Sequence, residues 1–142
     1  MTKYLLDTNI VSEATRPRPS EALTRWLARQ PDSRLFIATL TLGEIGRGIL
    51  EKPPGRKRTE LEAWFSGAEG PSALFRGRVL AFDEAAALEW AKLMAAGRTQ
   101  GEPRSALDMV IAATAAANGC TVVSGNERHF RGVVKLINPL GY

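Results

Sequence analysis

The sequence predicts an α/β fold in which helices cover both faces of a mostly parallel central sheet, giving three layers, α/β/α. The first reason is that short apolar segments typical of strands alternate with amphipathic segments typical of helices. The second is composition, because 44% hydrophobic and 24% charged residues are usual for a globular chain. The third is length, since 142 residues without a repeat or linker suit a single domain over residues 1–142.

The predicted elements are bounded by residues that commonly start and stop helices. Thr8 or Asn9 caps the first helix, and Asp83 caps a later one. Gly119 ends the helix that begins near Pro103. The predicted strands cover residues 4–7, 34–38, 79–82, 121–124 and 134–137. The predicted helices cover residues 8–14, 20–30, 39–50, 56–69, 83–94 and 103–118.

Composition also excludes several kinds of site. With one cysteine, Cys120, and one histidine, His129, the chain can form neither an internal disulfide nor a structural zinc site. No apolar run approaches the roughly 18 residues that span a bilayer, and no secretory signal is visible, so we expect a cytoplasmic protein without a membrane partner. The net charge is +4, and 14 of the 19 basic residues are arginine, which suits a nucleic-acid partner.

Three acidic residues stand in apolar surroundings, where a carboxylate needs a partner. Asp7 ends the first strand within LLDTNIV, and Glu44 lies early in the helix TLTLGEIGRGI. Asp108 is the only charge in SALDMVIAATAAAN, a helix that is apolar nearly all round. If the strands are parallel, Asp7, Glu44 and the loop after Ser124 share one edge of the sheet. The start of the Asp108 helix can reach the same edge.

Each acid also has a purely structural interpretation. Asp7 could be the N-cap of the helix that follows, and Asp108 could favour the dipole of its own helix. Glu44 could pair with Arg47, although the glycines at 43, 46 and 48 indicate close backbone packing or a nearby ligand. Carboxylates gathered at one edge repel one another unless a cation holds them. Oxygen ligands suit Mg²⁺ or Mn²⁺, and such a site can activate water for phosphodiester hydrolysis.

Five segments, in order and with matching spacing, resemble the PIN-domain ribonucleases, and among them the VapC toxins of the FitB-like branch. They are LLDTNIVSE, GEIGRGI, ALDMVIAATA, TVVSGNERHF and the closing INP. The resemblance implies a PIN-like domain whose acids bind Mg²⁺ or Mn²⁺ and which cleaves RNA. It further implies the toxin of a type II toxin–antitoxin pair, held inactive by a VapB- or FitA-like antitoxin. Such toxins form homodimers and larger toxin–antitoxin complexes, and they reach promoter DNA through the antitoxin.

Carried over by motif, the family's first three acids fall on Asp7, Glu44 and Asp108. The resemblance makes Asp7 and Asp108 the expected metal ligands and Glu44 the residue that positions or deprotonates the attacking water. Thr8 takes a polar position that assists the first acid. Arg47 could neutralise these acids when no metal is present.

The loop after the fourth strand departs from the family pattern. Asn126 stands where FitB-like relatives carry Asp, and His129 stands where other relatives carry Asp before Phe. Asn126 still offers an oxygen, so we expect it to orient the metal shell or the scissile phosphate. Glu127 could substitute for the missing acid. With three certain carboxylates, we expect weaker metal binding, or a site that substrate phosphate completes.

Two other functions compete with the ribonuclease hypothesis. A catalytically weak PIN domain could act mainly as a regulatory binding subunit with an antitoxin on promoter DNA, and Asn126 favours this alternative. A nucleotide-binding α/β domain is disfavoured, because no G-x-G-x-x-G or P-loop stretch follows the first strand. For the ribonuclease, the expected contacts to the RNA backbone are Arg16, Arg18 and the basic cluster 56–58.

Overall fold

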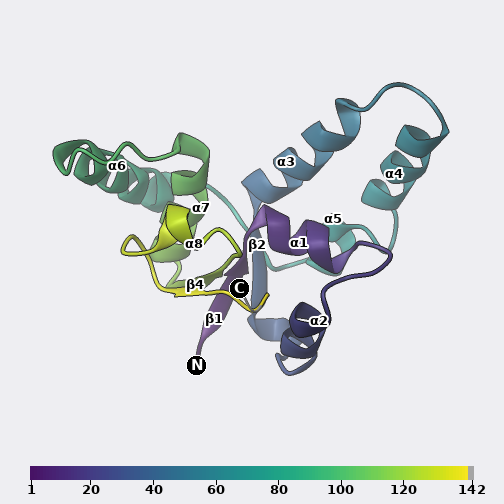
Figure 1. The fold of residues 1–142 in the computed structure, drawn as a ribbon, viewed down its shortest axis with the longest axis horizontal. Helices are drawn as coiled ribbons and strands as arrows, with labels where there is room; N and C mark the ends of the chain where they lie inside the picture. Colours follow the sequence, from purple (N-terminus) through teal and green to yellow (C-terminus); the bar gives the residue numbers. More distant parts are fainter. Residues whose placement is uncertain (141–142) are drawn as a thin grey trace.

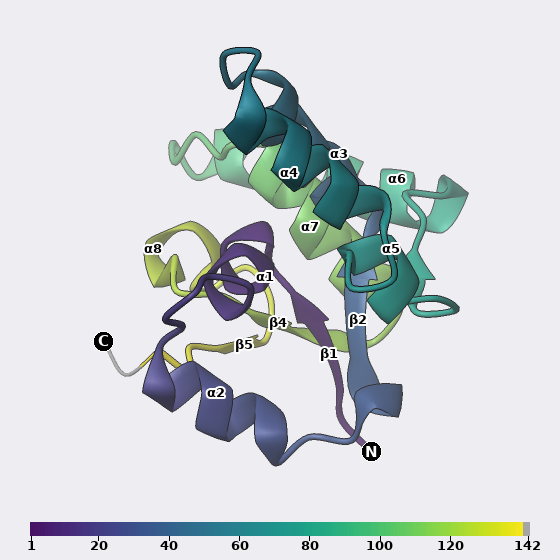
Figure 2. The same cartoon turned by 90° about the vertical axis from the view of Figure 1, so that its right-hand side faces the viewer.

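A computed structural model describes residues 1–140, and within them a five-stranded sheet is packed between helices (Figures 1 and 2). Every neighbouring pair of strands is parallel, and the strand order is β3-β2-β1-β4-β5. The predicted α/β class and parallel sheet are therefore confirmed. The strands are β1 (Lys3–Leu6), β2 (Leu35–Ala38), β3 (Val79–Leu80), β4 (Cys120–Val123) and β5 (Leu136–Ile137).

The six predicted helices occur in the predicted order, with two corrections at their starts, and two further short helices cover residues 71–74 and 127–130. Asp7 itself is the N-cap of the first helix, in place of Thr8 or Asn9. Ser105 caps the helix that carries Asp108, so Pro103 lies before that helix. None of the described helices combines the length and the apolar character needed to cross a bilayer. The helices are α1 (Thr8–Ala14), α2 (Glu21–Ala28), α3 (Thr39–Leu50), α4 (Arg56–Ser66), α5 (Pro71–Leu74), α6 (Glu84–Thr99), α7 (Ala106–Ala117) and α8 (Glu127–Phe130).

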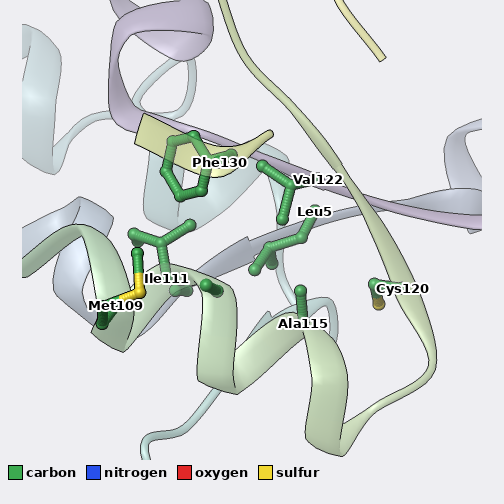
Figure 3. Close-up of a cluster of buried hydrophobic side chains, with 9 residues drawn as sticks. Leu5, Met109, Ile111, Ala115, Cys120, Val122 and Phe130 are labelled. Atoms are coloured by element: carbon green, nitrogen blue, oxygen red, sulfur yellow. The ribbon is translucent and has the colours of Figure 1, made fainter. Parts of the chain in front are cut away.

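One hydrophobic cluster lies between the sheet and α7. Successive strand residues point to opposite faces of a sheet, and Leu5 of β1 and Val122 of β4 both point toward this cluster. They pack there with Met109 and Ile111 of α7 and with Phe130 of α8, and all five are at most 1% exposed (Figure 3). This packing fixes α7 and α8 relative to the two central strands.

A second cluster covers the opposite face of the sheet. Leu6 and Val123, each one residue further along its strand, pack against Ile10 of α1 and Leu23 of α2. Leu6 is paired with Val123 across the β1–β4 ladder, so these two residues lie next to each other on the same face of the sheet. The residues that follow this pair therefore leave the sheet side by side.

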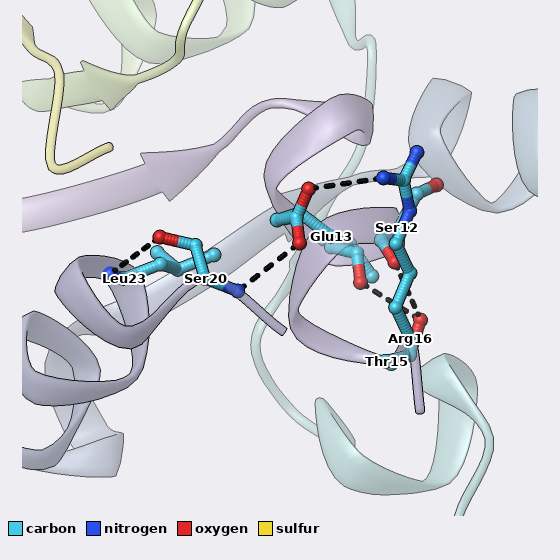
Figure 4. A network of polar contacts seen from close by, with 7 residues as sticks. Ser12, Glu13, Thr15, Arg16, Ser20 and Leu23 are labelled. Atoms are coloured by element: carbon cyan, nitrogen blue, oxygen red, sulfur yellow. Dashed lines mark hydrogen bonds and ion pairs between the residues drawn. The ribbon is translucent and has the colours of Figure 1, made fainter. Parts of the chain in front are cut away.

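The proline-containing loop between α1 and α2 is tied back to α1 by Glu13 (Figure 4). One carboxylate oxygen of Glu13 accepts a hydrogen bond from the backbone N–H of Ser20, and the other pairs with Arg16 at 3.3 Å. The hydroxyl of Ser20 then caps α2 by accepting from the N–H of Leu23. This single acid therefore holds both the loop and the start of the next helix.

Candidate active site at the carboxyl ends of the strands

The site lies where the chain turns away in opposite directions from two adjacent strands. In the order β3-β2-β1-β4-β5, the connections from β1 and from β4 lead to opposite sides of the sheet. Ligands of open parallel sheets bind at such a switch point, beyond the carboxyl ends of the strands. Asp7 follows β1 and Ser124 follows β4, and the Ser124 hydroxyl donates a hydrogen bond to Asp7 Oδ2 at 2.8 Å. This bond spans the switch point.

Asp7 is a buried carboxylate, only 4% exposed. Burial raises the pKa of its carboxyl, because the charged form is separated from water. Hydrogen bonds from the Ser124 hydroxyl and the Thr8 N–H lower this pKa, whereas the negative charges of Asp108 and Glu44 raise it. Within the described part of the chain, no Lys, Arg or His forms an ion pair with Asp7. The site thus holds an acid whose charge no basic side chain offsets.

Glu44 is connected to the start of α1 through Thr8. The Thr8 hydroxyl donates to Glu44 Oε1 at 2.6 Å, while the Thr8 N–H donates to Asp7 Oδ1 at 2.8 Å. Thr8 therefore joins the first two predicted acids through two different groups. Arg47 does not neutralise these acids, because its guanidinium pairs with Glu51 at 3.0 Å. Both expectations for Arg47 are corrected by this i,i+4 pair.

Asp108 lies in the first turn of α7, and its side chain is 24% exposed. Its backbone N–H donates to the hydroxyl of Ser105, the N-cap of the helix. Its carboxylate Oδ2 lies 2.8 Å from Nδ1 of His129, which reaches it from α8. The charge of Asp108 contributes to the raised pKa of Asp7, so the two predicted metal ligands face the same region.

Asn126 lies in the turn between β4 and α8. Its backbone N–H donates to the Ser124 hydroxyl at 2.9 Å, and that hydroxyl in turn donates to Asp7. The next residue, Glu127, pairs with Arg131 at 3.1 Å and accepts from Asn138, and these contacts lower the pKa of its carboxyl. Glu127 is therefore already engaged by a cationic partner, which disfavours the expectation that it replaces the missing acid.

The donor set fits a hard cation that binds few protein ligands. No three His, Cys, Asp or Glu side chains among the described residues are grouped closely enough to hold a metal ion. Asp7 nevertheless carries a carboxylate that accepts from the Ser124 hydroxyl, and the charge of Asp108 acts on it. Mg²⁺ is usually held by one or two carboxylates, water and substrate phosphate. The uncompensated charge on buried Asp7 is the observation that makes a cation fit there.

Two partners in this site were not singled out by the sequence. Ser124 binds Asp7 because Leu6 and Val123 are paired across the β1–β4 ladder. This register cannot be predicted from the local sequence. His129 binds Asp108 because α8 folds back over α7. Cys120 lies buried in the core, and burial raises the pKa of its thiol.

The basic residues expected to contact phosphate differ in availability. Arg18 and Lys57 are exposed and have no ion pair to another described residue. The others are offset by nearby carboxylates, at distances between 2.7 and 3.3 Å: Arg16 by Glu13, Arg56 by Glu60, and Arg58 by Glu62.

Comparison with known proteins shows to which family the chain belongs. The model of the PIN domain matches residues 4–136. VapC ribonuclease Y4jK of Sinorhizobium fredii is 34% identical over 136 residues, which cover 95% of this chain and 96% of that protein. Toxin FitB of Neisseria gonorrhoeae is 33% identical over 136 residues, with the same shares covered.

The fold agrees with these sequence relatives. A solved structure of FitAB bound to the IR36 DNA fragment is similar with a TM-score of 0.88 and 31% identity, covering 98% of this chain and 96% of that chain. The likeness confirms the expected PIN-like three-layer arrangement, including the parallel sheet with helices on both faces. The chain belongs to the PIN-domain family, among the homologues of VapC and FitB.

Proposed function

We propose that this protein is a Mg²⁺- or Mn²⁺-dependent ribonuclease and the toxin of a type II toxin–antitoxin pair, inhibited by a cognate antitoxin. The observation that carries the proposal is Asp7, a buried carboxylate at the switch point whose charge no described basic side chain offsets. Asp108 and Glu44 add negative charge at the same place. A hydrolase that works on a phosphodiester needs such a cation-binding group of oxygens.

The residues divide the work of hydrolysis among them. Asp7 and Asp108 would hold the cation, which when bound would stabilise charge on the phosphate and lower the pKa of water. Glu44, whose Oε1 accepts a hydrogen bond from the Thr8 hydroxyl, would take the proton of the attacking water. The water oxygen forms a bond to phosphorus, the bond to the leaving ribose oxygen breaks, and that oxygen takes a proton from solvent. Asn126 orients the phosphate through its amide.

The names of the relatives support the biological part of the proposal. One is a VapC ribonuclease and another is the toxin FitB, each about one third identical along nearly the whole chain. The FitAB structure is bound to DNA, which supports a toxin that meets promoter DNA as part of a complex with its antitoxin. RNA is the proposed substrate, and the cognate antitoxin is a VapB- or FitA-like protein.

Cleavage of RNA by single-residue variants tests the site. Asp7→Asn and Asp108→Asn should each lower the cleavage rate at least about 100-fold in Mg²⁺, because each removes a charged oxygen ligand. Asp83→Asn is the matched control, since Asp83 also caps a helix but lies on α6, outside the site. The site assignment is wrong if Asp108→Asn cleaves as fast as the unaltered protein. Circular dichroism of each variant checks that the fold is kept.

The number of metal ions bound per chain tests the role of Asn126, which stands where relatives carry a fourth acid. Titration calorimetry with Mn²⁺ should show at most one tight ion per chain without RNA, because Asn126 adds no charge to the three carboxylates. Replacing Asn126 by Asp should tighten this binding. Two tight ions per chain of the unaltered protein would contradict the role given to Asn126.

The second candidate function is a regulatory binding subunit with little catalysis, which Asn126 favours. Expression of the chain alone in a bacterial host separates the two. A ribonuclease toxin should stop growth, and Asp7→Asn should relieve the arrest. If the unaltered chain leaves growth unaffected but tightens the grip of its antitoxin on promoter DNA, the regulatory function is the right one.

A further inference from the structure

A hollow of about 380 Å³ lies beside the proposed active site, between the loop after α6, the start of α7 and the region of α8. Its walls include Arg104, Ser105, Arg128, His129 and Arg131. Three of these side chains also line a second, more open hollow that contains Asn126: Arg128, His129 and Arg131. The two hollows therefore form neighbouring parts of one surface that begins at the site and continues past α8.

Two arginines of this surface have charges that no carboxylate offsets. Arg128 is exposed, and its side chain has neither an ion pair nor a hydrogen bond to another described residue. Arg104 donates to the backbone oxygen of Leu93 at 2.7 Å and to Oε1 of Gln100 at 3.3 Å, both uncharged acceptors. Six other described arginines each pair with a carboxylate, and Arg131 of the same surface is one of them.

The remaining charges leave the hollow positive. Arg131 is offset by Glu127, and Glu102 is the acid in the wall of the first hollow. Glu102 forms no ion pair with Arg104 or Arg128. A guanidinium without a carboxylate partner is well suited to bind phosphate, because its fork of donors can match two phosphate oxygens.

His129 connects this hollow to the acids of the site. It lines both hollows, and its Nδ1 lies 2.8 Å from Asp108 Oδ2. A chain of phosphates that has one member at Asp108 and Asn126 can therefore place a neighbouring member against Arg128 and Arg104. Contacts of this kind position a nucleic acid without reading its bases.

We propose that Arg104 and Arg128 form a phosphate subsite for the RNA backbone, next to the position of the scissile phosphate. This inference rests on the proposed ribonuclease function. It identifies where the RNA backbone next to the scissile bond would bind. Arg128 supplies an exposed, adjustable contact, and Arg104 supplies one held in place by α6. The subsite binds substrate and takes no part in the bond changes.

Salt-dependent binding of a short, fluorophore-labelled single-stranded RNA tests the subsite, in an Asp7→Asn background that does not cleave. Each phosphate contact to a single strand contributes about 0.7 to the slope of log K against log salt concentration. Arg128→Gln should therefore lower the slope by about 0.7 and weaken binding roughly 3- to 10-fold at low salt. Arg104→Gln should act in the same direction. Arg25→Gln removes the same charge from an exposed residue of α2 and should change neither quantity beyond error.

The kinetics of otherwise unaltered protein give a second readout. Arg128→Gln should raise KM with little change in kcat, because the subsite binds the substrate and its transition state alike. If Arg128→Gln and Arg25→Gln behave alike in binding, in slope and in KM, the subsite is wrong, whereas loss of cleavage in Asp7→Asn would still support the ribonuclease. If Arg128→Gln weakens binding to duplex DNA but not to RNA, the hollow serves DNA and the inference is overturned. If the unaltered protein binds RNA but never cleaves it, the proposed ribonuclease function is refuted. The comparison of Arg128→Gln with Arg25→Gln in RNA binding would still decide whether the subsite exists.

Discussion

At the scale of single residues, Asp7 is the position where structural and functional demands meet. Its carboxylate caps α1 and accepts a hydrogen bond from the Ser124 hydroxyl, and the residue is buried. The hydrogen bonds favour its charged form, but burial outweighs them and the pKa is raised. An N-cap alone needs no such burial, and Asp83 performs that role on the exposed surface. The difference between these two caps is what singles out Asp7 as a candidate ligand.

The raised pKa of Asp7 predicts a specific dependence of stability on pH. A carboxyl with a folded pKa above its unfolded value binds protons more readily in the folded state, so its contribution is largest below about pH 3.8 and is lost as pH rises. Without metal, Asp7→Asn should therefore melt at a higher temperature than the unaltered protein at neutral pH. The gap should shrink toward pH 4.

The effect of added metal on the Tm of Asp7→Asn is the control for this prediction. Mn²⁺ should raise the Tm of the unaltered protein, since a ligand that binds only the folded state stabilises it. It should leave the Tm of Asp7→Asn nearly unchanged. An Asp7→Asn protein that melts lower than the unaltered one in a chelator, at every pH, would contradict the account of Asp7.

At the scale of elements, α3 carries Glu44 on a helix weakened by glycine. A Cβ on Gly46 would meet the ring of Phe65 at 3.5 Å, which is ordinary contact with α4. Gly43 and Gly48 have open space where a Cβ would lie, with nothing within 4 Å. The expectation of close backbone packing therefore holds for none of these three glycines, and the alternative of a nearby ligand stays a prediction.

Alanine substitution in α3 follows from this geometry. Gly43→Ala and Gly48→Ala should each increase the free energy of unfolding by about 0.5–1 kcal/mol, because alanine loses less backbone entropy in a helix. Urea unfolding followed by circular dichroism measures the change. Gly119→Ala is the contrast: its φ of 66° is left-handed, so a Cβ there should destabilise the protein. Equal effects at all three positions would refute the distinction.

At the scale of the whole molecule, the two hydrophobic clusters on opposite faces of the sheet hold the site together. Phe130 is fully buried against the α7 face and anchors α8, the helix that carries Arg128 and His129. The site therefore depends on a residue of the hydrophobic core.

Truncation of this anchor should be costly. Phe130→Ala should lower the free energy of unfolding by about 3–5 kcal/mol, through lost burial and the cavity left behind. Phe82→Ala, at a ring that is 39% exposed, should cost much less. Denaturant unfolding with matched m-values checks both. A Phe130→Ala protein as stable as Phe82→Ala would show that α8 is not anchored as described.

Local residue patterns predicted the alternation of elements, the parallel sheet and the three acids. LLDTNIV carries both a strand and its misplaced carboxylate, and Asp108 stands out as the one charge of its helix. Only the tertiary structure decided which groups surround those acids. The β1–β4 register brings Ser124 to Asp7, the packing of α8 on α7 brings His129 to Asp108, and an i,i+4 pair with Glu51 removes Arg47. The Ser124–Asp7 contact joins residues 117 positions apart and depends on strand order, and the His129–Asp108 contact depends on helix packing, so no local pattern records either. The Arg47–Glu51 pair is local, and the i,i+4 spacing could have predicted it.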